Sequence, residues 1–362
     1  MQSNPITDDL RIREIKKVMP PEQAHSEFPI TDRAVKTVSR ARQGIHDILT
    51  GQSDRLVVVI GPCSIHDTNA AIDYAKKLLR RMDDLRNDLL IVMRVYFEKP
   101  RTTVGWKGLI NDPDLDESFN INRGLRLARK LLLDINEWGI PVATEYLDLI
   151  TPQYVSDLIG WGAIGARTTE SQAHRQLASG LSCPVGFKNA TDGTIKVAVD
   201  AIGAARQPHH FLSVTKAGHS AIFSTTGNED CHVILRGGVK TNYDETSVAN
   251  TASALHNANL SSKIMIDFSH ANSLKQHERQ KVVGKDVAAQ IAKGDERIFG
   301  VMIESHLIAG SQKVIPGEQL VYGQSITDAC LGWDASAELL TVLAKAVKER
   351  RIVLKQQKNG QS

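Results

Sequence analysis

The sequence predicts an α/β fold in the form of a (β/α)8 TIM barrel, and three observations support this fold class. First, eight apolar segments of roughly five residues follow one another between residues 56 and 303. Second, stretches with apolar residues at helical spacing alternate with these segments. Third, the segments are nearly continuous, which is typical of strands buried on both faces of a parallel sheet. Eight repeats favour a closed barrel over an open doubly wound sheet, and no Gly-x-Gly-x-x-Gly follows any strand.

The repeated strands and helices account for most of the chain. The expected strands cover residues 56–60, 89–93, 141–144, 163–166, 184–187, 232–235, 263–266 and 299–303. The expected helices cover residues 69–84, 120–138, 153–160, 170–180, 194–206, 247–257, 276–293 and 335–350. Together they predict one catalytic barrel over residues 55–350, with a C-terminal tail over residues 351–362.

Two segments fall outside this repeat. Residues 1–54 are expected to form an N-terminal arm with one helix over residues 34–49, because Pro20-Pro21 interrupts any earlier helix. The segment 208–231 is longer than a usual loop. It contains two short apolar stretches around a Lys-Ala-Gly-His turn, which predicts an inserted β-hairpin at residues 210–215 and 220–225.

Composition excludes several classes of protein. The chain has 362 residues, of which 41% are hydrophobic and 23% charged, as in ordinary globular proteins. Its 44 basic and 41 acidic residues leave a charge of +3, so we expect no nucleic-acid partner. No apolar run is long enough to span a membrane. Without an export signal or a Cys-x-x-Cys pair, the four cysteines predict free thiols and a cytoplasmic location.

The residues at or just beyond the strand ends are polar in every repeat. In order they are Cys63, Arg94, Glu145, Arg167, Lys188, Arg236, Asp267 with His270, and Glu304. The carboxyl ends of barrel strands meet at one end of the barrel, where the active sites of this fold lie. The pattern therefore predicts a functional site built from all eight strands.

Cations dominate this set. Arg94, Arg167, Lys188 and Arg236 would repel one another around an empty site, so they predict a small, multiply anionic ligand. The alternative is that internal carboxylates neutralise them, with Glu145, Asp267 and Glu304 as the candidates. The segment Lys99-Pro100-Arg101-Thr102 adds cations and hydroxyls after the second strand. It suits a second phosphate, or it is an ordinary basic surface loop.

Cys63, His270, Glu304 and Asp328 offer sulfur, nitrogen and oxygen donors from four separate parts of the chain. Such a mixed set suits a catalytic divalent ion with an open position better than a closed structural zinc site. Mn²⁺, Fe²⁺, Co²⁺ and Zn²⁺ are all candidates. The spacing leaves open that the cysteine and the histidine are simply packed residues.

Several long motifs are similar to those of one enzyme family. They cover residues 60–67 (IGPCSIHD), 93–108, 162–172, 184–189, 266–272 and 325–333. Together they resemble the microbial type I 3-deoxy-D-arabino-heptulosonate 7-phosphate (DAHP) synthases, especially the phenylalanine-sensitive type. The resemblance extends from about residue 8 to residue 350. Ala190 departs from the usual glycine, but this change removes no functional group.

The resemblance implies the first step of the shikimate pathway, in which phosphoenolpyruvate, erythrose 4-phosphate and water give DAHP and phosphate. It implies one divalent ion per subunit on Cys63, His270, Glu304 and Asp328. The implied phosphoenolpyruvate ligands are Arg94, Lys99, Arg167, Lys188 and Arg236. Those for erythrose 4-phosphate are Lys99, Pro100, Arg101, Thr102 and Asp328. The implied catalytic residues are Lys99, Glu145, His270 and Cys63, with Lys99 as a proton donor and Glu145 as a candidate to orient water.

The resemblance also implies feedback inhibition by an aromatic amino acid, with phenylalanine expected. The matching effector positions are Asp8, Asp9, Asp148, Gln153, Leu177, Leu181, Ser182, Phe211, Ser213 and Phe223. Ser213 resembles the phenylalanine-responsive type, whereas Phe223 replaces a smaller aliphatic residue. Members of this family are commonly dimers or tetramers, so we expect a homodimer or homotetramer.

Two alternatives remain at the level of sequence. The related synthase that uses arabinose 5-phosphate resembles this chain in its barrel and cations, but residues 99–102 favour the four-carbon aldehyde. A non-catalytic metabolite sensor should have lost a ligand or a lysine, and none is missing.

Overall fold

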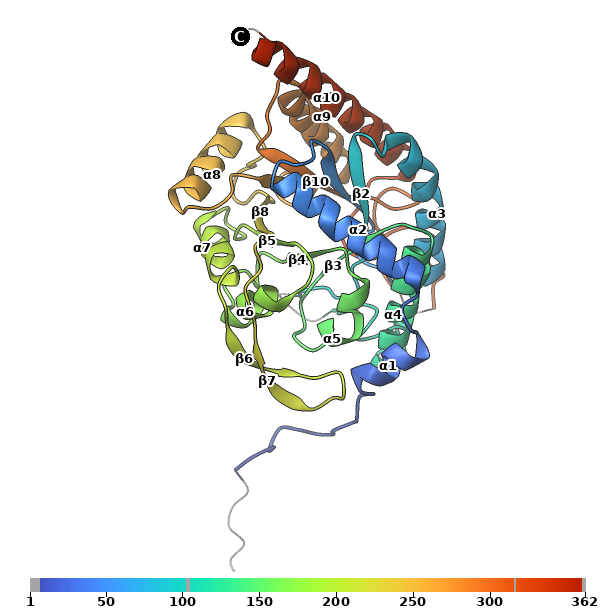
Figure 1. Cartoon of the computed structure of the whole chain (residues 1–362). Coiled ribbons are helices and arrows are strands. Elements are labelled where there is room, and N and C mark those ends of the chain that lie inside the picture. Colours follow the sequence, from blue (N-terminus) through green and yellow to red (C-terminus); the bar gives the residue numbers. More distant parts are fainter. Residues whose placement is uncertain (1–6, 102–104, 316, 360–362) are drawn as a thin grey trace, which may run out of the picture.

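The computed structural model describes residues 7–101, 105–315 and 317–359, and eight of its strands form a closed parallel barrel (Figure 1). Around the barrel the order is β1-β10-β9-β8-β5-β4-β3-β2, so strands that are consecutive in the barrel repeat lie side by side. The strands are β1 (Leu56–Gly61), β2 (Leu89–Arg94), β3 (Val142–Glu145), β4 (Trp161–Ile164), β5 (Val185–Lys188), β8 (Cys231–Leu235), β9 (Ile264–Asp267) and β10 (Ile298–Glu304). The predicted (β/α)8 fold class is confirmed.

Helices connect the strands and surround the barrel. They are α1 (Pro21–Glu27), α2 (Asp32–Leu49), α3 (Thr68–Leu85), α4 (Ile121–Glu137), α5 (Pro152–Val155), α6 (Gln172–Gly180), α7 (Lys196–Ala205), α8 (Glu245–Asn257), α9 (Gln280–Ala292) and α10 (Trp333–Asn359). Short 3₁₀ turns, η1 (Ser156–Leu158) and η2 (His277–Arg279), follow α5 and precede α9.

Three helices differ most from the sequence prediction. Helix α1 was not expected, yet Pro21 is its first residue, where a missing N–H costs nothing. The helix expected at 153–160 is broken, because Arg129 and Arg42 bind the carbonyls of Tyr154 and Ser156. Helix α10 continues to Asn359, through most of the expected tail.

The last helix is tied to the beginning of the barrel. Arg351 of α10 donates hydrogen bonds to both carboxylate oxygens of Asp54, at 2.7 and 2.8 Å. The same guanidinium donates to Asp88 at 2.5 Å. Asp54 and Asp88 precede β1 and β2, so α10 holds the amino ends of the first two strands together.

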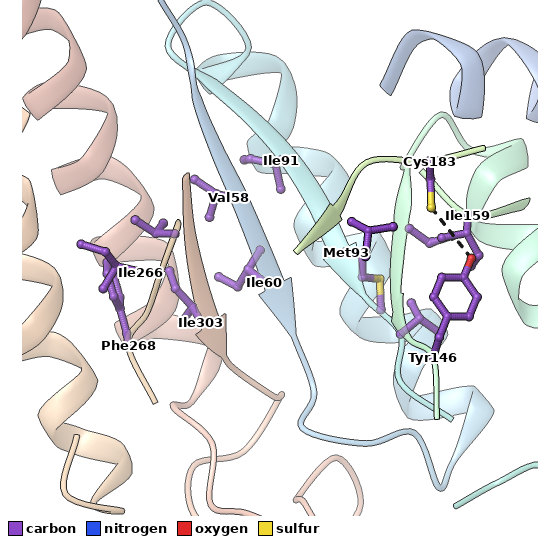
Figure 2. Packing of buried hydrophobic residues seen from close by; sticks show 14 of the residues in the cluster. Val58, Ile60, Ile91, Met93, Tyr146, Ile159, Cys183, Ile266, Phe268 and Ile303 are labelled. Carbon is purple, nitrogen blue, oxygen red and sulfur yellow. Dashed lines mark hydrogen bonds between the residues drawn. The ribbon is translucent and has the colours of Figure 1, made fainter. Parts of the chain in front are cut away.

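The apolar core lies in two layers. Between strands and helices, Val58 and Ile60 pack with residues of neighbouring strands (Figure 2). Inside the barrel, Val57 and Leu90 pack with Ile45 of α2, which therefore covers the end where the strands begin. Burying each such side chain contributes roughly 1.5–3 kcal/mol. The polar residues at the carboxyl ends of the strands lie at the opposite end.

The inserted hairpin is present beside the barrel. Strands β6 (His210–Val214) and β7 (Ser220–Ser224) pair antiparallel, with Phe211 opposite Phe223. Residues 7–20 form an extended arm that leaves the barrel at α1 (Figure 1). In the described parts of the chain, no helix combines the length and apolar character needed to cross a bilayer.

Candidate active site

Three predicted metal ligands meet at the carboxyl end of the barrel. Cys63 follows β1, Glu304 ends β10, and Asp328 precedes α10. Their ligand atoms all lie within 4.8 Å of one another, and the cysteine and glutamate are buried. One sulfur and two carboxylate donors suit a catalytic transition-metal ion, so the residues present fit the predicted group.

His270, the fourth predicted ligand, lies beside these three residues. Its Nε2 is 3.9 Å from Glu304 Oε1, and its Nδ1 is 2.8 Å from Asp267 Oδ2, off the line of an ideal hydrogen bond. The residue has φ +58°, a region that non-glycine residues seldom adopt and that often marks functional positions.

Glu304 is held on every side by buried partners. Its Oε1 accepts a hydrogen bond from Arg94 at 3.0 Å, and its Oε2 accepts one from Ser269 at 2.8 Å. The amide of Gln280 binds the Glu304 carbonyl and N–H, both at 2.9 Å. These contacts fix the carboxylate before any ligand binds.

Arg94 is committed to the protein rather than free for a ligand. It also donates to the carbonyls of Pro62 and Cys63, and it stacks 3.5 Å from the ring centre of Tyr96. Burial alone would lower the Arg94 pKa, but its neighbours Tyr96 and Glu304 raise it above its usual value. Arg94 therefore stays charged and positions Glu304.

Lys99 lies against the metal ligands. Its Nζ is 3.0 Å from Cys63 Sγ and 3.8 Å from Asp328 Oδ2. Burial would lower the Lys99 pKa, but Cys63, Asp328 and Glu304 raise it. A charged ammonium thus lies against two of the predicted metal ligands.

The other three cations differ in whether a carboxylate pairs with them. Lys188 Nζ is 3.0 Å from Asp267 Oδ2 in a buried ion pair. Arg167 and Arg236 form no ion pair with a carboxylate in the part of the chain that the structure describes. Burial lowers the Arg236 pKa, and the nearby Arg167 lowers it further. These two guanidiniums remain free for an anionic ligand.

The remaining predicted residues lie around this end of the barrel. Glu145 is buried at the end of β3, and Gly165 leaves room for its carboxylate, because a Cβ there would lie 2.2 Å from Oε1. Arg101 is exposed and donates to the Trp106 carbonyl at 2.8 Å, next to partly buried Pro100. Thr102 lies outside the described residues.

Most of the predicted effector residues line a separate cavity of about 820 Å³ beside the hairpin. They are Gln153, Leu177, Leu181, Ser182, Phe211, Ser213 and Phe223. The rings of Phe211 and Phe223 stack with centres 6.1 Å apart. Asp148 is exposed outside this lining and accepts hydrogen bonds from the N–H groups of Ile150 and Thr151. Asp8 and Asp9, on the extended arm, are exposed as well.

Glu98, beside Lys99, was missed by the sequence analysis. Its carboxylate is buried and accepts a hydrogen bond from Thr151 at 3.0 Å. Burial raises the Glu98 pKa to about 7, and the charge of Asp148 adds to this. The contact joins the loop after β2 to the start of α5. Glu98 lies inside the motif at residues 93–108, which was the only signal of a role in the sequence. Its burial could not be predicted, because a single glutamate in a sequence does not show whether its side chain is buried.

We expect Glu98→Gln to change how stability depends on pH. The folded Glu98 pKa lies above the unfolded value, so the folded state binds the proton more tightly. This group's contribution is therefore largest below pH ~4.5 and falls as pH rises to 7, by about 3 kcal/mol. Urea unfolding at pH 5 and pH 8 should show Glu98→Gln gaining stability relative to wild type at pH 8. Parallel pH profiles for the two proteins would contradict this.

Comparison with known proteins identifies the family. The sequence profile of the DAHP synthetase I family matches residues 27–341. The chain belongs to this family. The DAHP synthase resemblance is confirmed, as is the assignment as an enzyme of the first step of the shikimate pathway.

Relatives of this DAHP synthetase I family member are similar over almost their full length. The Phe-sensitive phospho-2-dehydro-3-deoxyheptonate aldolase of Escherichia coli (strain K12) is 64% identical over 95% of this chain and 98% of its own. A Haemophilus influenzae relative is 57% identical over 95% of both chains. The solved structure of the phospho-2-dehydro-3-deoxyheptonate aldolase from Francisella tularensis SCHU S4 has a TM-score of 0.92 at 54% identity, covering 94% of this chain and 99% of that one.

Proposed function

We propose that this DAHP synthase holds one divalent ion per subunit, Mn²⁺, Fe²⁺, Co²⁺ or Zn²⁺, on Cys63, His270, Glu304 and Asp328. The observation that carries the proposal is the group of three donors within 4.8 Å, with Lys99 against it. When bound, the ion supplies a Lewis acid for the aldehyde oxygen of erythrose 4-phosphate. Removal of the ion tests this assignment.

The free cations define where phosphoenolpyruvate would bind. Arg167 and Arg236 are the groups that bind its phosphate, because their guanidiniums have no carboxylate partner among the described residues. Lys188 and Lys99 add positive charge from β5 and the loop after β2. Arg94 contributes mainly by holding Glu304.

Each remaining residue has a defined task in the condensation. Lys99 donates a proton to the aldehyde oxygen as negative charge develops there. Glu145 orients the water that adds to C2 of phosphoenolpyruvate, and the arginines stabilise the departing phosphate. Pro100, Arg101, Thr102 and Asp328 position erythrose 4-phosphate, whose phosphate is matched by the Arg101 guanidinium.

We further propose that phenylalanine inhibits the enzyme from the cavity beside the hairpin. The lining combines apolar walls, Leu177, Leu181 and Phe211, with the hydroxyl of Ser213. Burial of an aromatic ring there contributes of order 2 kcal/mol. Asp148, with Asp8 and Asp9 of the arm, supplies negative charge for the effector ammonium. The contact between Glu98 and Thr151 supports a route from this cavity to Lys99.

We expect millimolar phenylalanine to inhibit the wild type, and Asp148→Asn to stay active with at least about tenfold weaker inhibition. The asparagine keeps an oxygen for the Ile150 and Thr151 N–H groups, so only the charge is lost. Ser213→Gly should gain sensitivity to tyrosine, since it leaves room for a phenolic hydroxyl. Asp200→Asn, on the outer face of α7, is the control. No inhibition by phenylalanine, tyrosine or tryptophan would refute the regulatory proposal.

We also propose that the chain forms a homodimer or homotetramer in the cytoplasm. The arm exposes Leu10, Ile12 and Ile15 by 72%, 55% and 79%, which supports contacts within a homodimer or homotetramer. A cytoplasmic location is supported by four free cysteines, all buried.

A further inference from the structure

We propose that Asp267 is a positioning residue that orients His270 toward the metal ion and Lys188 toward phosphoenolpyruvate at the same time. The inference rests on the proposed function, in which His270 is a metal ligand and Lys188 a substrate ligand. Asp267 is the last residue of β9 and is fully buried. From the sequence it is a polar strand-end residue and one of the carboxylates that could neutralise the cations.

The geometry places both partners on one carboxylate oxygen. Asp267 Oδ2 is 2.8 Å from His270 Nδ1 and 3.0 Å from Lys188 Nζ. The other oxygen, Oδ1, accepts a hydrogen bond from the N–H of Ser269 at 3.0 Å. A carboxylate this deeply buried is costly unless it is paired, so these partners hold it and are held by it.

The contact with His270 is a close approach of Nδ1 to the carboxylate rather than an aligned hydrogen bond, and the negative charge favours a proton on that nitrogen. With its proton on Nδ1, toward Asp267, the imidazole keeps a lone pair on Nε2. Nε2 is the nitrogen beside Glu304, 3.9 Å from Oε1. Carboxylates that orient a ligating histidine in this way typically change metal affinity 10- to 100-fold when they are removed.

The contact with Lys188 acts on the second site. Lys188 is almost fully buried at the end of β5, and Asp267 is its ion-pair partner in the structure. Loss of the carboxylate would free the ammonium to turn away from the substrate phosphate. Asp267 therefore links the two sites through a single charged group, and its loss should affect both.

Asp267→Asn tests this because it keeps the size of the side chain and removes the charge. We expect Mn²⁺ affinity, measured by titration of the EDTA-treated and dialysed full-length protein, to fall 10- to 100-fold. At saturating Mn²⁺, KM for phosphoenolpyruvate should rise about tenfold. Circular dichroism establishes that the variant is folded.

Two variants separate the contacts. Ser269→Ala removes the Oγ bond to Glu304 but keeps the backbone bond to Asp267, so it should weaken Mn²⁺ binding and leave KM for phosphoenolpyruvate unchanged. Lys188→Met should raise that KM and leave Mn²⁺ affinity unchanged. This pair keeps the test decisive even if Asp267→Asn does not fold, because an unchanged KM for phosphoenolpyruvate in Lys188→Met would refute the Lys188 half of the inference.

Wild-type Mn²⁺ affinity in folded Asp267→Asn would overturn the positioning role, as would a KM for phosphoenolpyruvate no higher than in Ser269→Ala. Failure of the wild type itself to bind Mn²⁺ is a different result. It would overturn the metal centre, and with it the His270 half of this inference.

Discussion

Treatment with EDTA should lower DAHP formation by roughly a thousandfold, and added Mn²⁺ should restore it. An ion that polarises the aldehyde contributes several kcal/mol to the transition state, and each 1.36 kcal/mol is about a factor of ten in rate. Loss of phosphoenolpyruvate in a continuous assay is the measurement. Full turnover by a preparation shown to be free of metal would refute the metal centre.

The matching substitution is Cys63→Ser, which should abolish the effect of added Mn²⁺ while the protein stays folded. A neutral hydroxyl replaces the sulfur donor, and residues at the carboxyl ends of barrel strands carry function more than stability. Cys231→Ser is a suitable control. Cys231 is also buried and free, but it begins β8 at the far end of the barrel. Equal losses in both variants would point to damage to the fold.

Lys99→Met should lower kcat by about 10²- to 10⁴-fold, the range typical of a lost general acid. Methionine fills a similar volume but provides neither the proton nor the charge 3.0 Å from Cys63. Steady-state kinetics with both substrates and saturating Mn²⁺ give the measurement. Lys130→Met serves as the control, because Lys130 is exposed on α4 and pairs with Asp134. A kcat within tenfold of wild type would exclude Lys99 as the proton donor.

The barrel could be predicted because each strand is buried on both faces, and such strands leave continuous apolar runs. Their borders, as at β4, moved by up to two residues, since the pairing of strands sets where a strand begins. The break between α5 and η1 could not be predicted. It depends on Arg42 and Arg129, whose side chains bind carbonyls of that segment from distant helices.

The candidate site was predictable in its residue types but not in its pairing. The pattern of polar residues at the strand ends predicted Cys63 and Glu304, because closure of the barrel brings strand ends together whatever their separation in sequence. Which cation meets which carboxylate depends on side-chain directions inside the closed barrel. For that reason Arg94 and Lys188 proved to be paired, whereas Arg167 and Arg236 form no ion pair among the residues that the structure describes.

The bonds between Arg351 and the amino ends of β1 and β2 have a consequence for synthesis on the ribosome. Arg351 follows Asp54 by 297 residues and Asp88 by 263 residues along the chain. These bonds can therefore form only after all eight barrel strands have been synthesised. Until then, β1 and β2 lack these bonds. Strand β1 also lacks its neighbour β10 until that strand has emerged from the ribosome. A nascent chain with such uncovered strand edges is prone to wrong associations, and chaperone binding at this stage would shield them.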